Sequence, residues 1–189
     1  MHGHSIARVV GLFGTLFGLT LAFPALVGSW FGESEARHFL AFGIAYVALG
    51  QALWLFGRRR PTRLSVRDGF LIVALFWVLL SLLGAFPLMC CARLPFVDAL
   101  FESASGFTTT GATVLTGLDD MPRSLLLYRQ QLQWLGGMGL IVLGVAVLPL
   151  LGVGGMQLYR AEAPGPLKEE KLTPRITQTA RALWGLYLA

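Results

Sequence analysis

The sequence predicts an all-α, polytopic membrane protein: two leading transmembrane helices followed by one helix–pore loop–helix repeat. Of its 189 residues, 55% are hydrophobic and 13% are charged, whereas soluble domains carry about 25% charged residues. Four runs of 19 to 30 residues lack Asp, Glu, Lys, Arg and His. At about 1.5 Å of rise per helical residue, each run can cross a hydrocarbon layer of roughly 30 Å. This composition argues against a soluble enzyme.

The leading helices are predicted at about residues 6–30 and 38–57. The first uncharged run, between Arg8 and Glu33, has 24 residues, more than the apolar core of about 7–15 residues in a signal peptide. A basic loop with five arginines follows at 58–68. The next span is predicted at 69–92, and it contains Cys90 and Cys91, which are adjacent and therefore badly placed to bridge each other.

The charges predict the orientation of the spans. Eleven of the fifteen basic residues fall in the N-terminus, the 58–68 loop and the segment after the fourth span, and six of the ten acidic residues fall on the other side. Basic loops stay in the cytoplasm. We therefore expect a cytoplasmic N-terminus, a cytoplasmic linker at 152–181, and external segments at 33–35 and 93–123. The basic residues serve this orientation, so no nucleic-acid binding is expected.

Residues 93–123 interrupt the pattern of simple spans. Pro95 begins an apolar stretch that predicts a short helix at 95–105, too short to cross a membrane. Residues 108–113 follow it with three consecutive threonines and Gly111, which favour an extended backbone with one unusually free position. A fourth span is predicted at 124–151. A helix, an extended strand and a helix between two spans is the arrangement of a cation-selectivity filter.

Several further side chains are candidates for a role. Glu102 either attracts cations at the outer mouth or supports the filter through hydrogen bonds. Gly136, Gly137 and Gly139 are either a hinge or small residues that allow close helix packing, and Arg129 is predicted to reach the outer interface. The spans contain no paired carboxylates, no His/Cys cluster and no nucleophile with a base at usable spacing. We therefore expect neither an enzyme nor a cofactor.

Three motifs in order carry a resemblance: FESASGFTTTGATVL at 101–115, QWLGGMG at 133–139 and GVGGMQLYRAE at 152–162. They resemble the Trk/Ktr/HKT superfamily of potassium transporters, and within it the TrkH-type bacterial subunits. The resemblance covers nearly the whole chain. It implies four membrane–pore–membrane repeats around one pore, of which this sequence contains the first.

The resemblance also implies the site. The main-chain carbonyls of Thr109, Thr110, Gly111 and Ala112 would supply one quarter of a K⁺ filter, with the ion at Thr109 and Thr110. Thr108, Thr113 and Glu102 would support this strand. The implied activity is potassium uptake across the bacterial inner membrane, and the implied partners are membrane lipid, a homodimeric copy of the full protein and a TrkA-type nucleotide-binding regulator at the cytoplasmic face.

The sequence departs from the family pattern in length. Residues 182–189 read as the start of a further span that stops after eight residues. We therefore expect an N-terminal fragment or split gene product, which needs three further repeats or assembly with other copies to close a ring of carbonyls. Two alternatives stay open: a non-conducting assembly module of a Trk-type transporter, and a homotetrameric cation channel.

Overall fold

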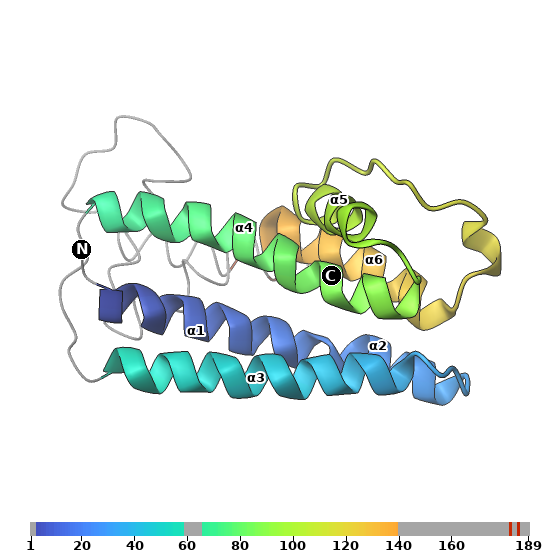
Figure 1. Cartoon of the computed structure of the whole chain (residues 1–189), viewed down its shortest axis with the longest axis horizontal. Helices are drawn as coiled ribbons and strands as arrows, with labels where there is room; N and C mark the ends of the chain where they lie inside the picture. The colour runs from blue at the N-terminus through green and yellow to red at the C-terminus, as the bar shows by residue number, and fades with distance from the viewer. Residues whose placement is uncertain (1–2, 59–65, 140–181, 183–184, 186–189) are drawn as a thin grey trace.

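A computed structural model of the chain describes residues 3–58, 66–139, 182 and 185. All regular secondary structure in this part of the chain is helical (Figure 1), which confirms the predicted all-α class. The elements are α1 (Gly3–Thr20), α2 (Ala22–Trp30), α3 (Ala36–Arg58), α4 (Val66–Cys91), α5 (Phe96–Phe107), the 3₁₀ turn η1 (Leu118–Asp120), α6 (Arg123–Trp134) and the π-helical turn η2 (Leu135–Gly139).

Three segments among the described residues are long and apolar enough to cross a membrane: Ile6–Trp30, Ala36–Gly57 and Ala74–Cys91. The first combines α1 and α2 across a break at Leu21. The predicted fourth span, 124–151, begins as α6 and η2, and its remainder lies outside the described residues. The linker at 152–181 and most of 58–68 and 182–189 also lie outside them.

Helices α1 and α3 pack side by side along their lengths (Figure 1). Glycines make this contact close: a Cβ atom added to Gly50 would lie 2.6 Å from the main-chain oxygen of Gly11. Backbones can approach this closely only where no side chain intervenes, as is common between membrane helices. The leading pair is therefore a tight hairpin rather than two separate anchors.

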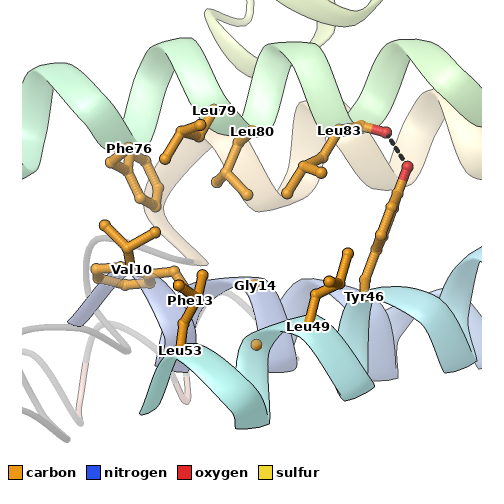
Figure 2. A pocket seen from close by; sticks show the side chains of 11 residues that line it. Val10, Phe13, Gly14, Tyr46, Leu49, Leu53, Phe76, Leu79, Leu80 and Leu83 are labelled. Atoms are coloured by element: carbon orange, nitrogen blue, oxygen red, sulfur yellow. Dashed lines mark hydrogen bonds between the residues drawn. The ribbon is translucent and has the colours of Figure 1, made fainter. Parts of the chain in front are cut away.

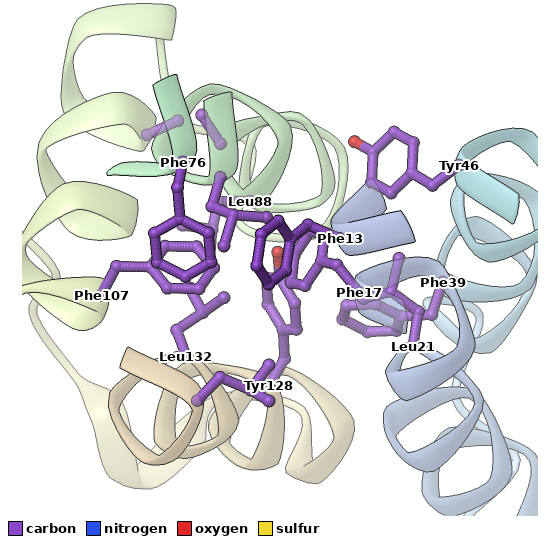
Figure 3. Close-up of a cluster of buried hydrophobic side chains, with 14 of the residues drawn as sticks. Phe13, Phe17, Leu21, Phe39, Tyr46, Phe76, Leu88, Phe107, Tyr128 and Leu132 are labelled. Carbon is purple, nitrogen blue, oxygen red and sulfur yellow. The ribbon is translucent and has the colours of Figure 1, made fainter. Parts of the chain in front are cut away.

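Aromatic side chains join this hairpin to the repeat that follows it (Figure 3). Phe17 of α1 meets Phe107 of α5 edge to face, with ring centroids 5.6 Å apart. Phe39 of α3 meets Tyr128 of α6 at 5.1 Å. All four side chains are fully buried, and aromatic pairs of this kind contribute roughly 0.5–1.5 kcal/mol beyond the area they bury. These two contacts therefore connect the end of α5 and the middle of α6 to the leading hairpin.

Two prolines within spans leave carbonyl groups without their usual helical partner, because proline has no N–H to donate to the residue four positions earlier. Pro87 in α4 would otherwise serve Leu83, and Pro24 in α2 would serve Thr20. The hydroxyl of Tyr46 donates to the oxygen of Leu83 at 2.6 Å (Figure 2). Nε2 of Gln131 donates to the oxygen of Thr20 at 3.1 Å. Each freed carbonyl is thus satisfied by a side chain from another helix, as an apolar surrounding requires.

A cavity of about 270 Å³ lies between α1, α3 and α4 (Figure 2). Its walls are almost entirely aliphatic and aromatic, with Val10 and Phe13 on α1, Leu49 on α3, and Phe76 and Leu80 on α4. Its lining is unlike that expected for an ion route, which needs polar oxygen atoms to replace the water around the ion.

The α2–α3 turn and the start of α6 lie at the end of the bundle away from the N-terminus (Figure 1). Glu33 ties this turn to α6. Its carboxylate accepts the backbone N–H of Arg123 at 2.7 Å, the N–H of Ser124 at 3.0 Å and the Ser124 hydroxyl at 2.5 Å. We call these contacts the Glu33 clamp. They satisfy amide groups in the first turn of α6, where the helix dipole favours a negative charge.

Candidate functional site: the loop after the short helix

Helix α5 and the loop at 108–117 form the unit on which the predicted site lies. The helix has 12 residues, so it spans about 18 Å and cannot cross the membrane. Its buried face packs against α4 and α6. Pro95 stands just before its first residue in an extended conformation, where proline is well tolerated.

The chain leaves α5 through a turn with two left-handed residues. Thr109 has φ of 55° and Gly111 has φ of 74°. The amide of Thr110 donates back to the oxygen of Ser105 at 3.0 Å, and the Thr108 hydroxyl donates to the oxygen of Ala104 at 2.8 Å. A positive φ is easy for glycine but costs a β-branched residue of order 1–3 kcal/mol. The β-branched run predicted an extended backbone from its first residue, whereas the structure begins with this turn.

The predicted ion ligands lie together on the exposed side of this turn. Thr108, Thr109, Thr110, Gly111 and Ala112 are all exposed. The hydroxyls of Thr108 and Thr110 are 2.8 Å apart. The oxygen of Ala112 accepts a hydrogen bond from the Ser105 hydroxyl at 2.7 Å, so one lone pair of that carbonyl is directed at α5.

Glu102 on α5 bonds residues 113–115, which we call the far limb of the loop. Its Oε1 accepts the amides of Val114 at 2.7 Å and Leu115 at 3.3 Å, and it also accepts the hydroxyl of Thr113. Glu102 is only 4% exposed. The structure therefore brings Glu102 and Thr113 together in a supporting arrangement, and the carboxylate does not face the solvent as a cation-attracting group would.

Arg129 completes this support from α6. Its Nε and Nη2 lie 3.3 and 3.2 Å from Oε2 of Glu102, and Nη2 also donates to the Thr113 hydroxyl at 3.1 Å. Its side chain is 13% exposed and pairs with Glu102 on α5, and the position of Arg129 at the outer interface stays a prediction. A signal for the pairing was present, because a carboxylate on the apolar face of a short helix needs a partner when it is buried.

The glycine motif of the fourth span lies against the end of α5. A Cβ atom on Gly136 would lie 1.9 Å from the oxygen of Phe107, so the two backbones are in direct contact there. Gly137 has a non-helical ψ of −112°, and Gly136, Gly137 and Gly139 all belong to the π-helical turn η2. For Gly136 the close contact favours the packing interpretation over the hinge.

Metal-binding side chains do not gather in the described ranges 3–58 and 66–139: no group there has three or more His, Cys, Asp or Glu residues placed to share an ion. The loop nevertheless presents oxygen atoms from main-chain carbonyls and threonine hydroxyls. Such neutral oxygens suit a large monovalent cation that exchanges quickly, because they replace its hydration shell without holding it by charge.

Comparison with known proteins places the chain in a family. The family described as TrkH, Cation transport protein, matches residues 35–189. The Trk system potassium uptake protein TrkH of Salmonella typhimurium is 52% identical over 190 residues, which are 100% of this chain and 39% of that protein. The corresponding protein of Halomonas elongata is 55% identical over 185 residues, covering 96% of this chain and 38% of that protein. The potassium uptake protein TrkG of Escherichia coli is 43% identical over 188 residues.

A solved structure agrees with these matches. The crystal structure of the potassium transporter TrkH from Vibrio parahaemolyticus superposes with a TM-score of 0.77 at 43% identity, covering 100% of this chain and 37% of that one. The chain thus spans about two fifths of the length of these relatives. The matching family consists of membrane transport proteins, not enzymes. The chain belongs to the TrkH family of cation transport proteins.

Proposed function

We propose that residues 108–113 are one strand of the selectivity filter of a potassium transporter. The single observation that supports this most directly is the pair of left-handed residues, Thr109 and Gly111, in an exposed turn after a helix too short to span. Alternating backbone conformations of this kind allow successive carbonyls to face one side. In this proposal the carbonyls of Thr109 and Thr110 coordinate K⁺, and Gly111 and Ala112 continue the strand.

The direction of α5 supports a cation at this place. The helix ends at Phe107, so the partial negative charge of its C-terminal end is at the loop. Glu102, Thr113 and Arg129 hold the opposite limb by hydrogen bonds. The loop is therefore held in place by these side chains, and a cation bound at the exposed oxygens of the turn would be stabilised by the negative end of α5.

One strand offers oxygens on one side of an ion. The remaining ligands must come from further polypeptide, and we propose three more repeats of the same kind, as the length of the relatives suggests. The alternatives are other copies of this chain, which would make a homotetrameric channel, or a non-conducting assembly role. Expression of residues 1–189 alone separates the homotetrameric channel from our proposal, which expects no potassium uptake from that segment. Flux through the chimera described below separates our proposal from the non-conducting assembly role.

Orientation and partners form part of the same proposal. The α2–α3 turn lies at the end of the bundle opposite the start of α1, and the 108–117 loop runs from α5 toward that end (Figure 1), which agrees with an external position for both and a cytoplasmic N-terminus. We place the protein in the bacterial inner membrane as a multi-pass chain. The proposed homodimer and the TrkA-type regulator at the cytoplasmic face rest on the Trk system membership of the relatives.

The test uses a chimera in which residues 1–189 replace the matching part of the Vibrio parahaemolyticus transporter. Gly111→Ser should lower the K⁺/Na⁺ flux ratio, because a side chain at φ of 74° strains the strand by roughly 1–3 kcal/mol. Gly117→Ser is the matched control: Gly117 has φ of 67° and, like Gly111, no atom within 4 Å of an added Cβ. It lies outside the proposed filter, so the flux ratio should be unchanged.

Competitive K⁺ and Na⁺ flux at matched membrane expression is the measurement. Thr108→Ala should act more mildly than Gly111→Ser, because its main-chain carbonyl remains. Equal flux ratios for Gly111→Ser and wild type, with a collapsed ratio for Thr108→Ala, would assign discrimination to hydroxyl groups and refute the carbonyl filter.

A further inference from the structure

The ion pair behind the loop assigns a role to a residue outside the proposed filter. We infer that Arg129 is a positioning residue for ion selection: it neutralises and orients Glu102, so that the loop is held by hydrogen bonds and no free charge stands beside the ion path. This inference rests on the proposed function and adds to it a residue on which the K⁺/Na⁺ selectivity depends.

The contacts form a closed triangle between three parts of the chain. Arg129 on α6 bonds Oε2 of Glu102 on α5 at 3.2 Å, and its Nη2 reaches the hydroxyl of Thr113 in the loop at 3.1 Å. The third side is the bond from Thr113 to Oε1 of Glu102. Each of the three parts is therefore fixed relative to the other two.

Little space remains around this triangle. The cavity between Glu102, Ser105, Ala112, Arg129 and Gln133 has about 10 Å³, roughly the volume needed for a single water molecule. There is consequently little room for water between the far limb of the loop and helices α5 and α6. The two charged side chains hold the far limb in position.

The charges themselves explain why the pair matters for selection. A carboxylate that is 4% exposed is costly without a partner, and removal of one member of a buried pair is much more disruptive than removal of both. A free carboxylate would also attract cations by its charge, and the smaller Na⁺ can approach it more closely than K⁺. Selection of K⁺ must come from neutral carbonyl oxygens, and Arg129 removes the competing attraction of the carboxylate.

The experiment measures the K⁺/Na⁺ flux ratio of the chimera at matched membrane expression. Arg129→Gln should lower the ratio by about tenfold, which corresponds to about 1.4 kcal/mol. The double variant Glu102→Gln/Arg129→Gln should return to within about threefold of wild type, because the amide oxygen still accepts the backbone N–H groups of the loop and no charge is left unpaired. The flux ratio of Arg129→Lys should lie between those of wild type and Arg129→Gln, since lysine keeps the positive charge but lacks the planar guanidinium that bonds two acceptors at once.

The matched control is Arg123→Gln, which removes the same charge from the same helix. The guanidinium of Arg123 lies 4.2 Å from the centroid of the Phe31 ring at the end of α2, so this variant should keep the wild-type ratio. Recovery in the double variant is the outcome that a purely space-filling role of Arg129 would not produce.

Several outcomes would overturn the inference. A wild-type ratio in Arg129→Gln, with a lowered ratio in Gly111→Ser, would leave the filter in place and refute the role of Arg129. A double variant as poor as the single variant would show that Arg129 acts by its bulk and not by its charge. A chimera without potassium selectivity would refute the proposed function and this inference with it. If Arg129→Gln fails to insert, the double variant and Arg129→Lys decide by the same criteria.

Discussion

Glu33 connects the α2–α3 turn to α6, and its carboxyl makes the stability of the fold depend on pH. Partial burial acts to raise the pKa of its carboxyl, but the hydrogen bonds from the side chain and amide of Ser124 and from the amide of Arg123 together outweigh it and lower the pKa from its ordinary value of 4.5. A carboxyl whose pKa is lowered by folding stabilises the fold when ionised. The stabilisation is therefore fully present above about pH 4.5 and is lost as the pH falls through the lowered value.

We accordingly predict that the thermal unfolding temperature of the purified chimera falls below pH 4.5, and that Glu33→Gln reduces this fall. The measurement is the unfolding temperature in detergent between pH 7 and pH 3.5. Glu35→Gln, in the same turn, is the control and should follow the wild-type curve. Identical pH curves for wild type and Glu33→Gln would show that the Glu33 clamp contributes nothing to the folded state.

The sequence predicts several residues of the candidate site but not the side chains with which they form hydrogen bonds. Glu102 was expected either to support the filter or to attract cations, and Arg129 to reach the interface, because composition shows that a charge exists and not where it points. The left-handed conformation of Thr109 was also beyond reach, since three β-branched threonines favour extended backbone. Local hydrogen bonds to Ala104 and Ser105 at the end of α5 accompany the turn, and they depend on where that helix ends.

Helix α4 contains Pro87 in its interior, so the carbonyl of Leu83 lacks its usual helical N–H partner. The hydroxyl of Tyr46 donates to this carbonyl instead, at 2.6 Å. An unpaired carbonyl in an apolar surrounding costs about 1–3 kcal/mol. We predict that Tyr46→Phe destabilises the protein by about that amount, and by much less when Pro87 is also replaced by Ala, whose N–H can serve Leu83.

This double-mutant cycle is measured by chemical unfolding in detergent. Tyr128→Phe is the comparison: Tyr128 donates to the oxygen of Gly84 at 2.9 Å, and the residue four positions later, Leu88, has its own N–H. Coupling with Pro87→Ala should therefore be weaker for Tyr128 than for Tyr46. Equal coupling for both tyrosines would mean that the missing N–H of Pro87 is not what Tyr46 compensates.

The helices themselves were largely accessible from the sequence. Long uncharged runs mark α1 to α4, because only a helix satisfies its backbone groups in a membrane, and Pro95 marks the start of α5. The break at Leu21 and the π-helical turn at 135–139 were not predicted. The break lies three residues before Pro24, whose missing N–H interrupts the helical bonding, whereas the π-helical turn lies where Gly136 contacts the backbone of Phe107, which hydropathy does not record.

For the whole molecule, the distribution of charge predicts orientation. Eleven of the fifteen basic residues lie in the segments proposed as cytoplasmic. We predict that a single cysteine at residues 60–66 or 165–172, in a chimera whose Cys90 and Cys91 are replaced by serine, is protected from an impermeant thiol reagent in intact cells. A cysteine at Glu35 or Asp119 should be labelled. External labelling at 60–66 would invert the proposed orientation.

The bond between Gln131 and the oxygen of Thr20 has a consequence for how the chain is made. The two residues are 111 positions apart, and ribosomes add about 5–20 residues per second. The first span therefore waits on the order of 5–20 s after its own synthesis before α6 can supply the missing donor. During that interval the carbonyl freed by Pro24 must find a temporary partner, such as water at the bilayer edge or the insertion machinery. The first helix to be synthesised thus reaches its final hydrogen bonding only after a side chain on α6 has emerged.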